Sequence, residues 1–421
     1  MSGPAKRGQE TLSGSEADPA AAQFSWRFEA QLRCWTGSTE GDAITSGLRP
    51  RFPGRSIGTT RFTSRRYTPL SVTGSTIRIG VIGYGYWGPN LVRNFSELDG
   101  CAVTVIADRW PACREAAARR CPGARIVAEA EELIASPDVD AVVIATAVAT
   151  HFELALAALE ADKHVLVEKP LTASSAEAVR LIDEAQMRRL VLMVDHTFVY
   201  TGAVRKMKEI VAGGELGDLL YFDSVRINLG LFQKDINVLW DLAPHDLSIM
   251  DYLIDRQPLA VSAIGSCHIE RGIENIAYLI MHFGDDFIAH FHFNWLAPVK
   301  IRRTLIAGSR KMVLYDDIEP TEKVRIYDKG VTTNRVGADR EADYQTLVSY
   351  RTGDVWAPKL DSTEALRYVV AEFLDSIRAG RPPLTDGQAG LRVVRVLAAA
   401  QQSIKNGGQV RSVGSARHNA V

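Results

Sequence analysis

Apolar runs of strand length alternate with amphipathic segments over residues 76–195. The runs Ile77–Ile82 and 141–145 are almost entirely apolar, which is typical of strands covered on both faces of a sheet. Ser174 and Glu177 match a capping box, which predicts that a helix starts there. Strands that alternate with helices predict an α/β fold with a parallel, doubly wound sheet. The other predicted elements are strands at 101–107, 164–167 and 191–194 and helices at 111–120, 152–161 and 174–189.

The pattern changes after residue 195, because apolar runs now follow one another without helical segments between them. The run 287–295 alternates strictly, with apolar side chains on one face and His290 and His292 on the other. Such runs predict a large open sheet that is mostly antiparallel, and hence an α+β second domain over 196–421. The predicted strands are 259–266, 276–283, 286–295, 303–307, 311–315 and 323–327, and the predicted helices are 203–211, one that starts near Asp241, 363–379 and 390–404.

Residues 1–75 differ from the rest of the chain in composition. Gly, Ser, Thr and Pro occupy 33 of these 75 positions, whereas Leu, Ile, Val and Phe occupy 11. Such a stretch cannot bury enough apolar surface to offset chain entropy, so we expect a low-complexity, disordered extension. Its acid-free, arginine-rich part would suit a transit peptide, but the six acidic residues before it favour a solvated tail or an over-extended reading frame. We therefore expect three parts: the extension, a Rossmann domain at 76–195 and the second domain.

The charges of the 421 residues nearly cancel, with 49 Lys and Arg against 50 Asp and Glu. This balance gives no reason to expect nucleic acid or an anionic membrane as a partner. No apolar run approaches the length of a membrane helix. The five cysteines form no C-x-x-C pair and no secretory signal is visible, which indicates free thiols in the cytoplasm. We expect no metal site, because His290 and His292 have no identifiable third ligand.

A glycine loop directly follows the first predicted strand and precedes a helix. Gly83, Gly85 and Gly88 fit the pattern G-x-G-x-x-G. The first glycine permits the tight turn, the second lets the backbone approach a pyrophosphate, and the third lets helix and strand pack closely. Asp108 ends the second strand, where a carboxylate accepts hydrogen bonds from the adenosine ribose and repels a 2′-phosphate. The loop is therefore predicted to bind NAD, although the neighbouring Arg109 leaves NADP open.

Two further groups of polar residues are candidates for catalysis. Lys169, within Glu168-Lys169-Pro170, follows the fourth strand at the carboxyl edge of the sheet, where ligands bind. It is either a catalytic group that faces the cleft or a surface lysine paired with a carboxylate. Asp241 and His245 lie four residues apart, and Pro244 suits the first turn of a helix that starts near Asp241. They are either a base and its orienting carboxylate or, for Asp241, only a helix cap.

Several motifs occur in order along the chain: the loop Gly83–Gly88, Asp108, Thr146 with His151, Lys163-His164-Val165, Glu168-Lys169-Pro170 and Asp241-x-x-x-His245. With these motifs the chain from Thr76 onward resembles the Gfo/Idh/MocA family, named after glucose–fructose oxidoreductase, inositol dehydrogenase and MocA. The segments 86–95 and 237–246 are similar to the branch that includes UDP-N-acetylglucosamine (and its uronate) 3-dehydrogenases. Family members usually have proline where this chain has Ala147, and residues 1–75 have no counterpart.

The resemblance implies that hydride passes between NAD and a ring carbon of a sugar that carries a hydroxyl group. It implies that His245 is the base, with a pKa near neutral, and that Lys169 stabilises the developing alkoxide. Asp241 would bind a neighbouring hydroxyl and orient His245. The other residues that the resemblance assigns to the cofactor site are Gly83, Gly85, Tyr86, Trp87, Gly88, Asp108, Thr146, His151 and Glu168, together with Lys169.

The predicted function is therefore an NAD(P)-dependent dehydrogenase that acts on a sugar, at C3 of a nucleotide-linked sugar. Two alternatives stay open. One is an inositol or free-sugar dehydrogenase on the same fold. The other is a non-catalytic dinucleotide-binding regulator, which the intact Lys169 and His245 disfavour. The resemblance also implies a homo-oligomer, a dimer or tetramer that forms through the sheet of the second domain.

Overall fold

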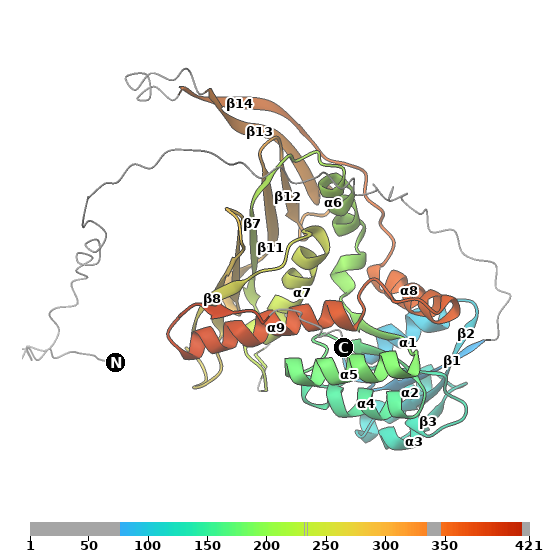
Figure 1. Cartoon of the computed structure of the whole chain (residues 1–421). Coiled ribbons are helices and arrows are strands. Elements are labelled where there is room, and N and C mark those ends of the chain that lie inside the picture. The colour runs from blue at the N-terminus through green and yellow to red at the C-terminus, as the bar shows by residue number, and fades with distance from the viewer. Residues whose placement is uncertain (1–75, 231, 234, 335–346, 415–421) are drawn as a thin grey trace, which may run out of the picture. The chain divides into compact units, whose positions relative to one another are not determined.

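The computed structural model describes residues 76–230, 232–233, 235–334 and 347–414. The predicted extension at 1–75 lies outside the described residues. Two sheets with helices against them make up the described part of the chain (Figure 1). The sheet nearer the N-terminus has six strands, and the second sheet has nine.

The six-stranded sheet is parallel throughout, with the strand order β3-β2-β1-β4-β5-β6. This is the order of a doubly wound dinucleotide-binding sheet, so the predicted fold of this region is confirmed. β1 (Ile77–Ile82) and β2 (Cys101–Ala107) have the predicted bounds. β3 (Arg125–Val127) was not predicted, because three residues carry too short a pattern. The other strands are β4 (Ala141–Ile144), β5 (His164–Glu168) and β6 (Leu192–Asp195).

Helices pack against both faces of this sheet and bury two separate groups of apolar side chains. The predicted capping box is confirmed at α5 (Ser175–Arg188), where the Ser174 hydroxyl accepts from Glu177 N and the Glu177 carboxylate accepts from Ser174 N. The short α3 (Ala130–Ile134) was not predicted. The other helices of this region are α1 (Gly88–Ser96), α2 (Pro111–Arg120) and α4 (His151–Glu160).

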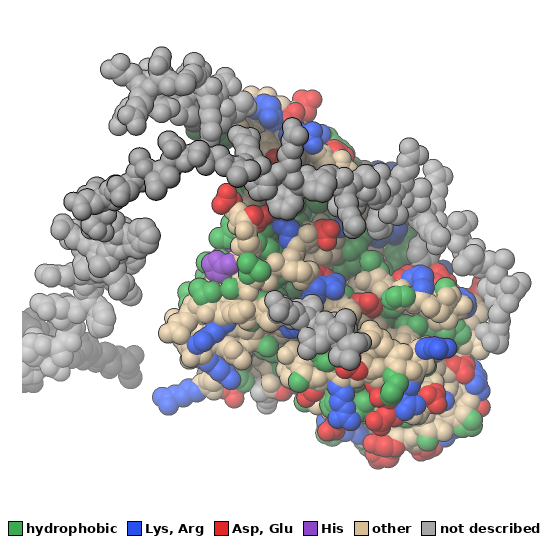
Figure 2. All heavy atoms as spheres, in the orientation of Figure 1, with side chains coloured by type: hydrophobic (Ala, Val, Ile, Leu, Met, Phe, Trp, Pro, Cys, Tyr) green, Lys and Arg blue, Asp and Glu red, His purple; other side chains and the backbone are tan. Residues whose placement is uncertain are grey.

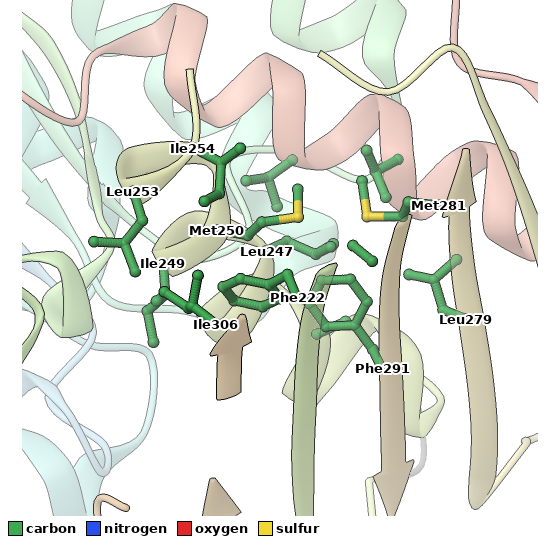
Figure 3. Packing of buried hydrophobic residues seen from close by; sticks show 14 of the residues in the cluster. Phe222, Leu247, Ile249, Met250, Leu253, Ile254, Leu279, Met281, Phe291 and Ile306 are labelled. Atoms are coloured by element: carbon green, nitrogen blue, oxygen red, sulfur yellow. The ribbon is translucent and has the colours of Figure 1, made fainter. Parts of the chain in front are cut away.

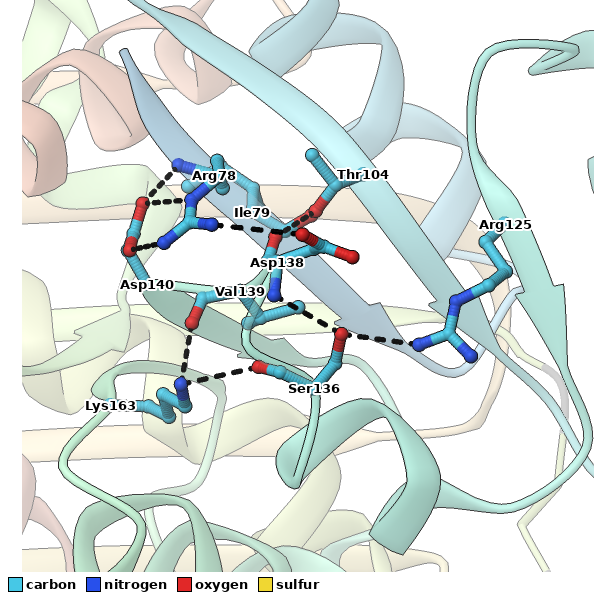
Figure 4. A network of polar contacts seen from close by, with 9 residues as sticks. All are labelled: Arg78, Ile79, Thr104, Arg125, Ser136, Asp138, Val139, Asp140 and Lys163. Atoms are coloured by element: carbon cyan, nitrogen blue, oxygen red, sulfur yellow. Dashed lines mark hydrogen bonds and ion pairs between the residues drawn. The ribbon is translucent and has the colours of Figure 1, made fainter. Parts of the chain in front are cut away.

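A polar network ties the beginnings of the strands together at the amino edge of the six-stranded sheet (Figure 4). Arg78 binds the Asp140 carboxylate through two nitrogens, with Nε–Oδ2 at 3.0 Å and Nη2–Oδ1 at 2.6 Å. The backbone N–H of Arg78 also donates to Asp140 Oδ2. Lys163 Nζ donates to the carbonyl oxygens of Val139 (2.6 Å) and Ser136 (3.3 Å). These bonds join the starts of β1, β4 and β5, which come from distant parts of the sequence.

The nine-stranded sheet has the order β14-β13-β12-β11-β7-β10-β9-β8-β15. β7 and β10 run parallel and the other neighbours antiparallel, so the predicted, mostly antiparallel second sheet is confirmed. β14 and β15 were not among the predicted strands. The nine strands are β7 (Leu219–Leu229), β8 (Ala260–Ser266), β9 (Ile276–His282), β10 (Ile288–Asn294), β11 (Leu296–Gly308), β12 (Met312–Asp316), β13 (Val324–Asn334), β14 (Leu347–Trp356) and β15 (Arg411–Ser412).

One face of this sheet is covered by α7 (Val238–Leu253), whose apolar side chains pack against it (Figure 3). Buried side chains of α6 (Gly202–Ala212) belong to the same apolar cluster. The strict alternation predicted for 287–295 is confirmed, because its apolar set is buried on this face. Phe291 from β10 lies 5.6 Å, between ring centroids, from Phe222 of β7. The opposite face carries Tyr278, His290 and His292, with the Tyr278 ring stacked on both imidazoles.

The last two helices return to the first sheet. α8 (Ala365–Ala379) packs beside α1, where Phe373 contacts Phe95 edge to face. α9 (Gly387–Lys405) contacts β8 of the second sheet and also α5 and β6 of the first (Figure 1). On the face that Figure 2 shows, acidic and basic side chains are interspersed. None of the helices in the described ranges combines the length and the apolarity that a membrane span requires.

Candidate active site

The glycine loop after β1 has the open backbone that a pyrophosphate requires. Gly83 has φ +96°, and a Cβ there would lie 2.5 Å from the Ala145 carbonyl oxygen. A Cβ on Gly88 would lie 2.1 Å from the Gly83 carbonyl oxygen, so the third glycine lets α1 approach the loop. A Cβ on Gly85 would meet nothing within 4 Å among the described residues, which leaves its backbone accessible. The loop therefore fits a dinucleotide at the N-terminus of α1.

Asp108 lies at the end of β2 and is anchored to this loop. Its Oδ2 accepts from Tyr84 N (2.7 Å) and its Oδ1 accepts from Trp110 N (2.8 Å). The carboxylate lines a cleft of about 480 Å³ that also includes Gly83, Arg109 and Thr146. A carboxylate held in place by two backbone N–H groups still has lone pairs for ribose hydroxyls. The geometry is thus compatible with the predicted ribose contact.

Tyr86 and Trp87 project from the tip of the glycine loop. Their exposed fractions are 81% and 41%, and their rings meet edge to face at 5.3 Å. Large aromatic side chains left this exposed are available to cover a bound molecule.

His151 is a buried brace beneath the cleft. Its Nδ1 lies 2.8 Å from the Pro170 carbonyl oxygen and its Nε2 lies 3.1 Å from the Thr146 carbonyl oxygen. Burial lowers the pKa of this imidazole. The side chain is 1% exposed, so it connects the loop after β4 to the loop after β5. Ala147 in the first loop has φ −70°, which is the value that proline would impose.

The helix that carries Asp241 and His245 starts earlier than predicted. α7 begins at Val238, and the Asn237 side chain caps it by accepting from Trp240 N (3.1 Å). Asp241 is therefore inside the helix and is not its cap. Pro244 lies in the helix interior, so the predicted start near Asp241 is wrong. The proline ring removes one backbone bond there, and the helix nevertheless continues to Leu253.

Lys169 and Asp241 meet although 72 residues separate them. Lys169 Nζ donates to the Asp241 carbonyl oxygen (3.0 Å) and lies 3.3 Å from Asp241 Oδ1. The other carboxylate oxygen, Oδ2, accepts from the indole Nε1–H of Trp295 at 3.2 Å. The side chains of the ion pair are only 14% and 20% exposed. Of the two alternatives for Lys169, the structure shows the lysine paired with a carboxylate, but in a nearly buried position at the carboxyl edge.

His245 lies one helical turn beyond Asp241, in surroundings rich in cations. Its ring meets Phe198 edge to face at 5.0 Å, and the Arg226 guanidinium lies 4.5 Å from the same Phe198 ring. Burial lowers the pKa of His245 well below its usual range, and the charges of Lys169 and Arg226 lower it further. The predicted near-neutral pKa is therefore wrong for this state of the protein. The imidazole is neutral at physiological pH, which leaves it able to accept a proton.

Glu168, predicted as a cofactor contact, is buried with 8% exposure. It is the strand neighbour of Asp195, which is 2% exposed. Sequence reasoning missed Asp195 and the adjacent His196, and it also missed the bond from Trp295 to Asp241. The alternating pattern did place Trp295 on the buried face, and Asp195 ends a strand of the parallel sheet. These two signals could have identified Trp295 and Asp195 as candidate site residues.

Comparisons with known proteins agree with this geometry. Residues 77–196 match the model of the oxidoreductase family with an NAD-binding Rossmann fold, and residues 204–314 match the GFO/IDH/MocA C-terminal domain. The chain is 30% identical over 331 residues to UDP-N-acetylglucosamine 3-dehydrogenase from Acidithiobacillus ferrooxidans, covering 77% of this chain and 96% of the relative. Myo-inositol 2-dehydrogenase from Thermotoga maritima is 24% identical over 348 residues, which cover 78% of this chain and 96% of that relative.

A solved structure gives the same result in three dimensions. The UDP-N-acetylglucosamine 3-dehydrogenase GnnA from Acidithiobacillus ferrooxidans superimposes with a TM-score of 0.65 at 26% identity, covering 78% of this chain and 98% of that protein. The expected family and the expected NAD-binding domain are thus confirmed. The chain belongs to the Gfo/Idh/MocA family of oxidoreductases, and its first sheet is an NAD-binding Rossmann domain.

Proposed function

We propose that this oxidoreductase oxidises the C3 hydroxyl of a nucleotide-linked sugar with NAD. The observation that carries the proposal is the contact of Lys169 Nζ with Asp241 at 3.0 and 3.3 Å, one helical turn from His245 and at the carboxyl edge of the NAD-binding sheet. The similarity to a UDP-N-acetylglucosamine 3-dehydrogenase over 96% of that relative supports the sugar and the position.

In this proposal each polar side chain has a defined task. NAD, when bound in the cleft, supplies the carbon that accepts hydride. His245 takes the proton of the sugar hydroxyl, because its imidazole is neutral and therefore able to accept one. Lys169 donates to the same oxygen and stabilises the alkoxide charge as it develops. Asp241, held by Lys169 and Trp295, fixes the ammonium and binds a neighbouring hydroxyl.

The cofactor contacts are part of the same proposal. Gly83, Gly85 and Gly88 hold the pyrophosphate with backbone N–H groups, and Asp108 holds the adenosine ribose. Tyr86 and Trp87 cover the pyrophosphate or the substrate cleft. Thr146 lines the nicotinamide end. His151 and Glu168 do not contact the cofactor directly but support the loops after β4 and β5. Arg109 lines the cleft beside Asp108 and keeps NADP as the alternative cofactor.

The charge around His245 favours a nucleotide-linked sugar over a neutral one. Arg226 is fully enclosed and paired with Asp246, whereas Arg302 is 34% exposed beside Phe198 and pairs with Asp317 at 3.2 Å. Both arginines lower the pKa of His245, after the effect of burial. The guanidinium of a partly exposed arginine such as Arg302 is a group that can bind the diphosphate of a nucleotide sugar. A neutral inositol carries no such anionic group.

A second candidate is an inositol dehydrogenase. It is favoured by the myo-inositol 2-dehydrogenase relative, which the chain covers to the same 96% at 24% identity. A regulator without catalysis is disfavoured, because the Lys169, Asp241 and His245 side chains come together in one place.

The test is to follow nicotinamide absorbance with the full chain and NAD against UDP-N-acetylglucosamine, its uronate, other UDP- and dTDP-sugars, free hexoses and inositols. We expect kcat/KM for a UDP-sugar to exceed that for myo-inositol by at least about 100-fold. Myo-inositol has no nucleotide diphosphate, so the protein groups that bind the diphosphate would stay unpaired. Faster turnover of myo-inositol would favour the second candidate. Tight NAD binding without turnover of any compound would favour the regulator.

We also propose that the chain divides at residues 195 and 196, acts in the cytoplasm and associates with itself through the outer face of the nine-stranded sheet. On that face Ile264, Tyr278 and His292 are cross-strand neighbours, and Ile264 and Tyr278 are 57% and 40% exposed. Exposed apolar side chains in a row are typical of an interface. Light scattering should report a dimer or tetramer, and Tyr278→Glu should shift it toward the monomer.

A further inference from the structure

The proposed function leaves NADP as an alternative cofactor, and the choice is made at the carboxyl end of β2. There Arg109 directly follows Asp108, and both residues line the cleft. In doubly wound sheets a carboxylate at this place binds the ribose hydroxyls of NAD, whereas a nearby arginine binds the 2′-phosphate of NADP. The two neighbours therefore favour opposite cofactors, and the other side chains of the cleft decide between them.

The backbone turn after β2 is fixed by three contacts. Asp108 Oδ1 accepts from Trp110 N at 2.8 Å, which closes an Asx-type turn. The Arg114 guanidinium donates to the carbonyl oxygens of Asp108 (2.9 Å) and Arg109 (2.8 Å). Pro111 starts α2, and a residue before proline is restricted to the extended conformation, which Trp110 adopts with ψ 122°. The fold therefore sets the directions in which the Arg109 and Trp110 side chains leave the backbone.

Trp110 holds the Arg109 side chain at the cleft. The guanidinium carbon lies 5.4 Å from the centroid of the Trp110 ring, which makes a cation–π contact. Both residues line the cleft. A guanidinium that lies on an aromatic ring keeps the N–H groups at its edge free for an anion. Arg109 is therefore a suitable ligand for a phosphate, and its presence alone would favour NADP.

Two further acidic residues line the same cleft. β3 lies beside β2 in parallel register, and Asp108 N donates to the Val127 carbonyl oxygen at 3.2 Å. The chain that leaves β3 therefore runs beside the turn that carries Arg109. It contributes Glu129 and Glu131 to the cleft, at the start of α3.

The charges that line the cleft do not balance. Asp108, Glu129 and Glu131 stand against Arg109, so the lining carries three negative charges and one positive charge. NAD has only hydroxyl groups on its adenosine ribose, whereas NADP carries a phosphate there. Because each carboxylate repels that phosphate, the lining disfavours NADP although Arg109 is present.

We propose that Glu129 and Glu131 are specificity-determining residues that exclude the 2′-phosphate of NADP, which Arg109, held by Trp110, would otherwise bind. The cleft then selects NAD through the ribose contact of Asp108. This rests on the dinucleotide cleft of the proposed function and not on its sugar. Acidic residues at the start of a helix also suit its partial positive charge, so cofactor choice has to be measured separately from stability.

The test is calorimetric titration of the full chain with NAD and with NADP, in the absence of any sugar. We expect the wild type to bind NAD at least about tenfold more tightly than NADP. Glu129→Gln/Glu131→Gln should bind NADP about tenfold more tightly than the wild type does, with NAD affinity changed by less than about twofold, because glutamine keeps the size and removes the charge. The gain should shrink as salt is added, since salt screens exposed charges.

Three further variants show where the gain comes from. Glu132→Gln is the matched control, because Glu132 lies in the same helical turn but pairs with Arg125 at 2.6 Å and does not line the cleft. It should leave both affinities unchanged. Adding Arg109→Ala to the double variant should remove the gain in NADP affinity, and adding Trp110→Leu should reduce it. Thermal unfolding of each variant reports stability separately.

Equal affinity of the wild type for NAD and NADP overturns the proposal, as does a chain that binds neither. It is also overturned if the double variant gains no NADP affinity, or if Glu132→Gln gains as much. None of these measurements involves a sugar. If NAD is bound selectively but no sugar is oxidised, the proposed function fails while the assignment of Glu129 and Glu131 stands.

Discussion

The two edges of the six-stranded sheet treat polar groups in opposite ways. At the amino edge, Arg78 and Asp140 satisfy each other through two nitrogens, and Lys163 donates to two backbone carbonyl oxygens (Figure 4). At the carboxyl edge, Asp195 and His196 are more deeply buried, yet several of their polar atoms have no partner among the described residues. Polar groups at the amino edge therefore hold strands together, whereas polar groups at the carboxyl edge remain available for binding or catalysis.

The difference has an energetic meaning. A buried polar atom without a hydrogen bond lowers the stability of the folded protein, whereas a paired group does not. A chain keeps such atoms where ligands bind, which in doubly wound sheets is the carboxyl edge. We therefore expect changes at the amino edge to reduce stability and changes at the carboxyl edge to reduce activity.

The largest effect that would sharpen this comparison is expected for His245→Asn. Loss of a general base lowers kcat by about 10²- to 10⁴-fold, while NAD binding should persist. In the wild type the lowered pKa of His245 should keep the base neutral, and turnover should continue, well below the pH at which an ordinary histidine protonates. Steady-state rates over a pH series check both points. Wild-type turnover in this variant would show that His245 is not the general base.

Asp108→Ala changes the carboxyl edge at a distance from the reacting carbon. We expect NAD affinity to fall by about tenfold, because charged hydrogen bonds to the ribose are lost, and NADP affinity to fall less. Calorimetric titration of the full chain with both cofactors measures the two affinities. An equal loss for NAD and NADP would show that Asp108 supports only the glycine loop, through its bond to Tyr84 N.

Asp140→Asn should break the amino edge instead. Arg78 holds the pKa of Asp140 below its usual value, so this carboxylate stabilises the fold above the pKa it has in the unfolded chain and stops doing so as pH falls through its folded pKa. The variant should melt a few degrees earlier near neutral pH, with turnover unchanged, and the difference should vanish in acid. Thermal unfolding at several pH values tests this. A loss of turnover at temperatures where the variant is still folded would mean that the amino edge also affects catalysis.

Asp195→Asn should give the smallest effect and the opposite sign. Burial raises the pKa of Asp195 to about 6, so the folded protein loses stability as pH rises from the unfolded pKa of the carboxyl through that value. Asparagine removes this loss, so the variant should melt slightly later than the wild type above about pH 6, and the gain should shrink in acid. A variant that melts earlier at alkaline pH would place Asp195 with the structural groups of the amino edge.

The local sequence pattern was enough to predict much of the first sheet. β1 and β2 have the predicted bounds because apolar runs end at Gly83 and Asp108, and α5 starts where its capping box predicts. The start of α7 was not predictable in this way, because Asn237 caps the helix and Pro244 is tolerated inside it. Proline in a first turn is the more common case, and the exception is visible only from the helix bounds in the structure.

The site was predictable only in part, for a different reason. The glycine loop and Asp108 are close in sequence and carry a known spacing, so the dinucleotide cleft followed from the pattern. The contact between Lys169 and Asp241 depends on how two sheets pack. The alternating pattern places Trp295 on the buried face of its strand, but it does not show that the indole donates to Asp241. Asp195 and His196 come at the end of a buried strand, and the local pattern does not show that their polar atoms are left without partners among the described residues.

The most direct measurement compares the two lysines that flank β5. Lys163 precedes the strand at the amino edge and Lys169 follows it at the carboxyl edge. Turnover and thermal unfolding are measured for Lys163→Met and Lys169→Met, each with NAD affinity as a control for folding of the cleft. The comparison predicts that Lys169→Met loses turnover, by about 1,000-fold, with melting and NAD affinity nearly unchanged, and that Lys163→Met melts earlier but turns over normally. Loss of stability without loss of turnover in Lys169→Met would contradict it.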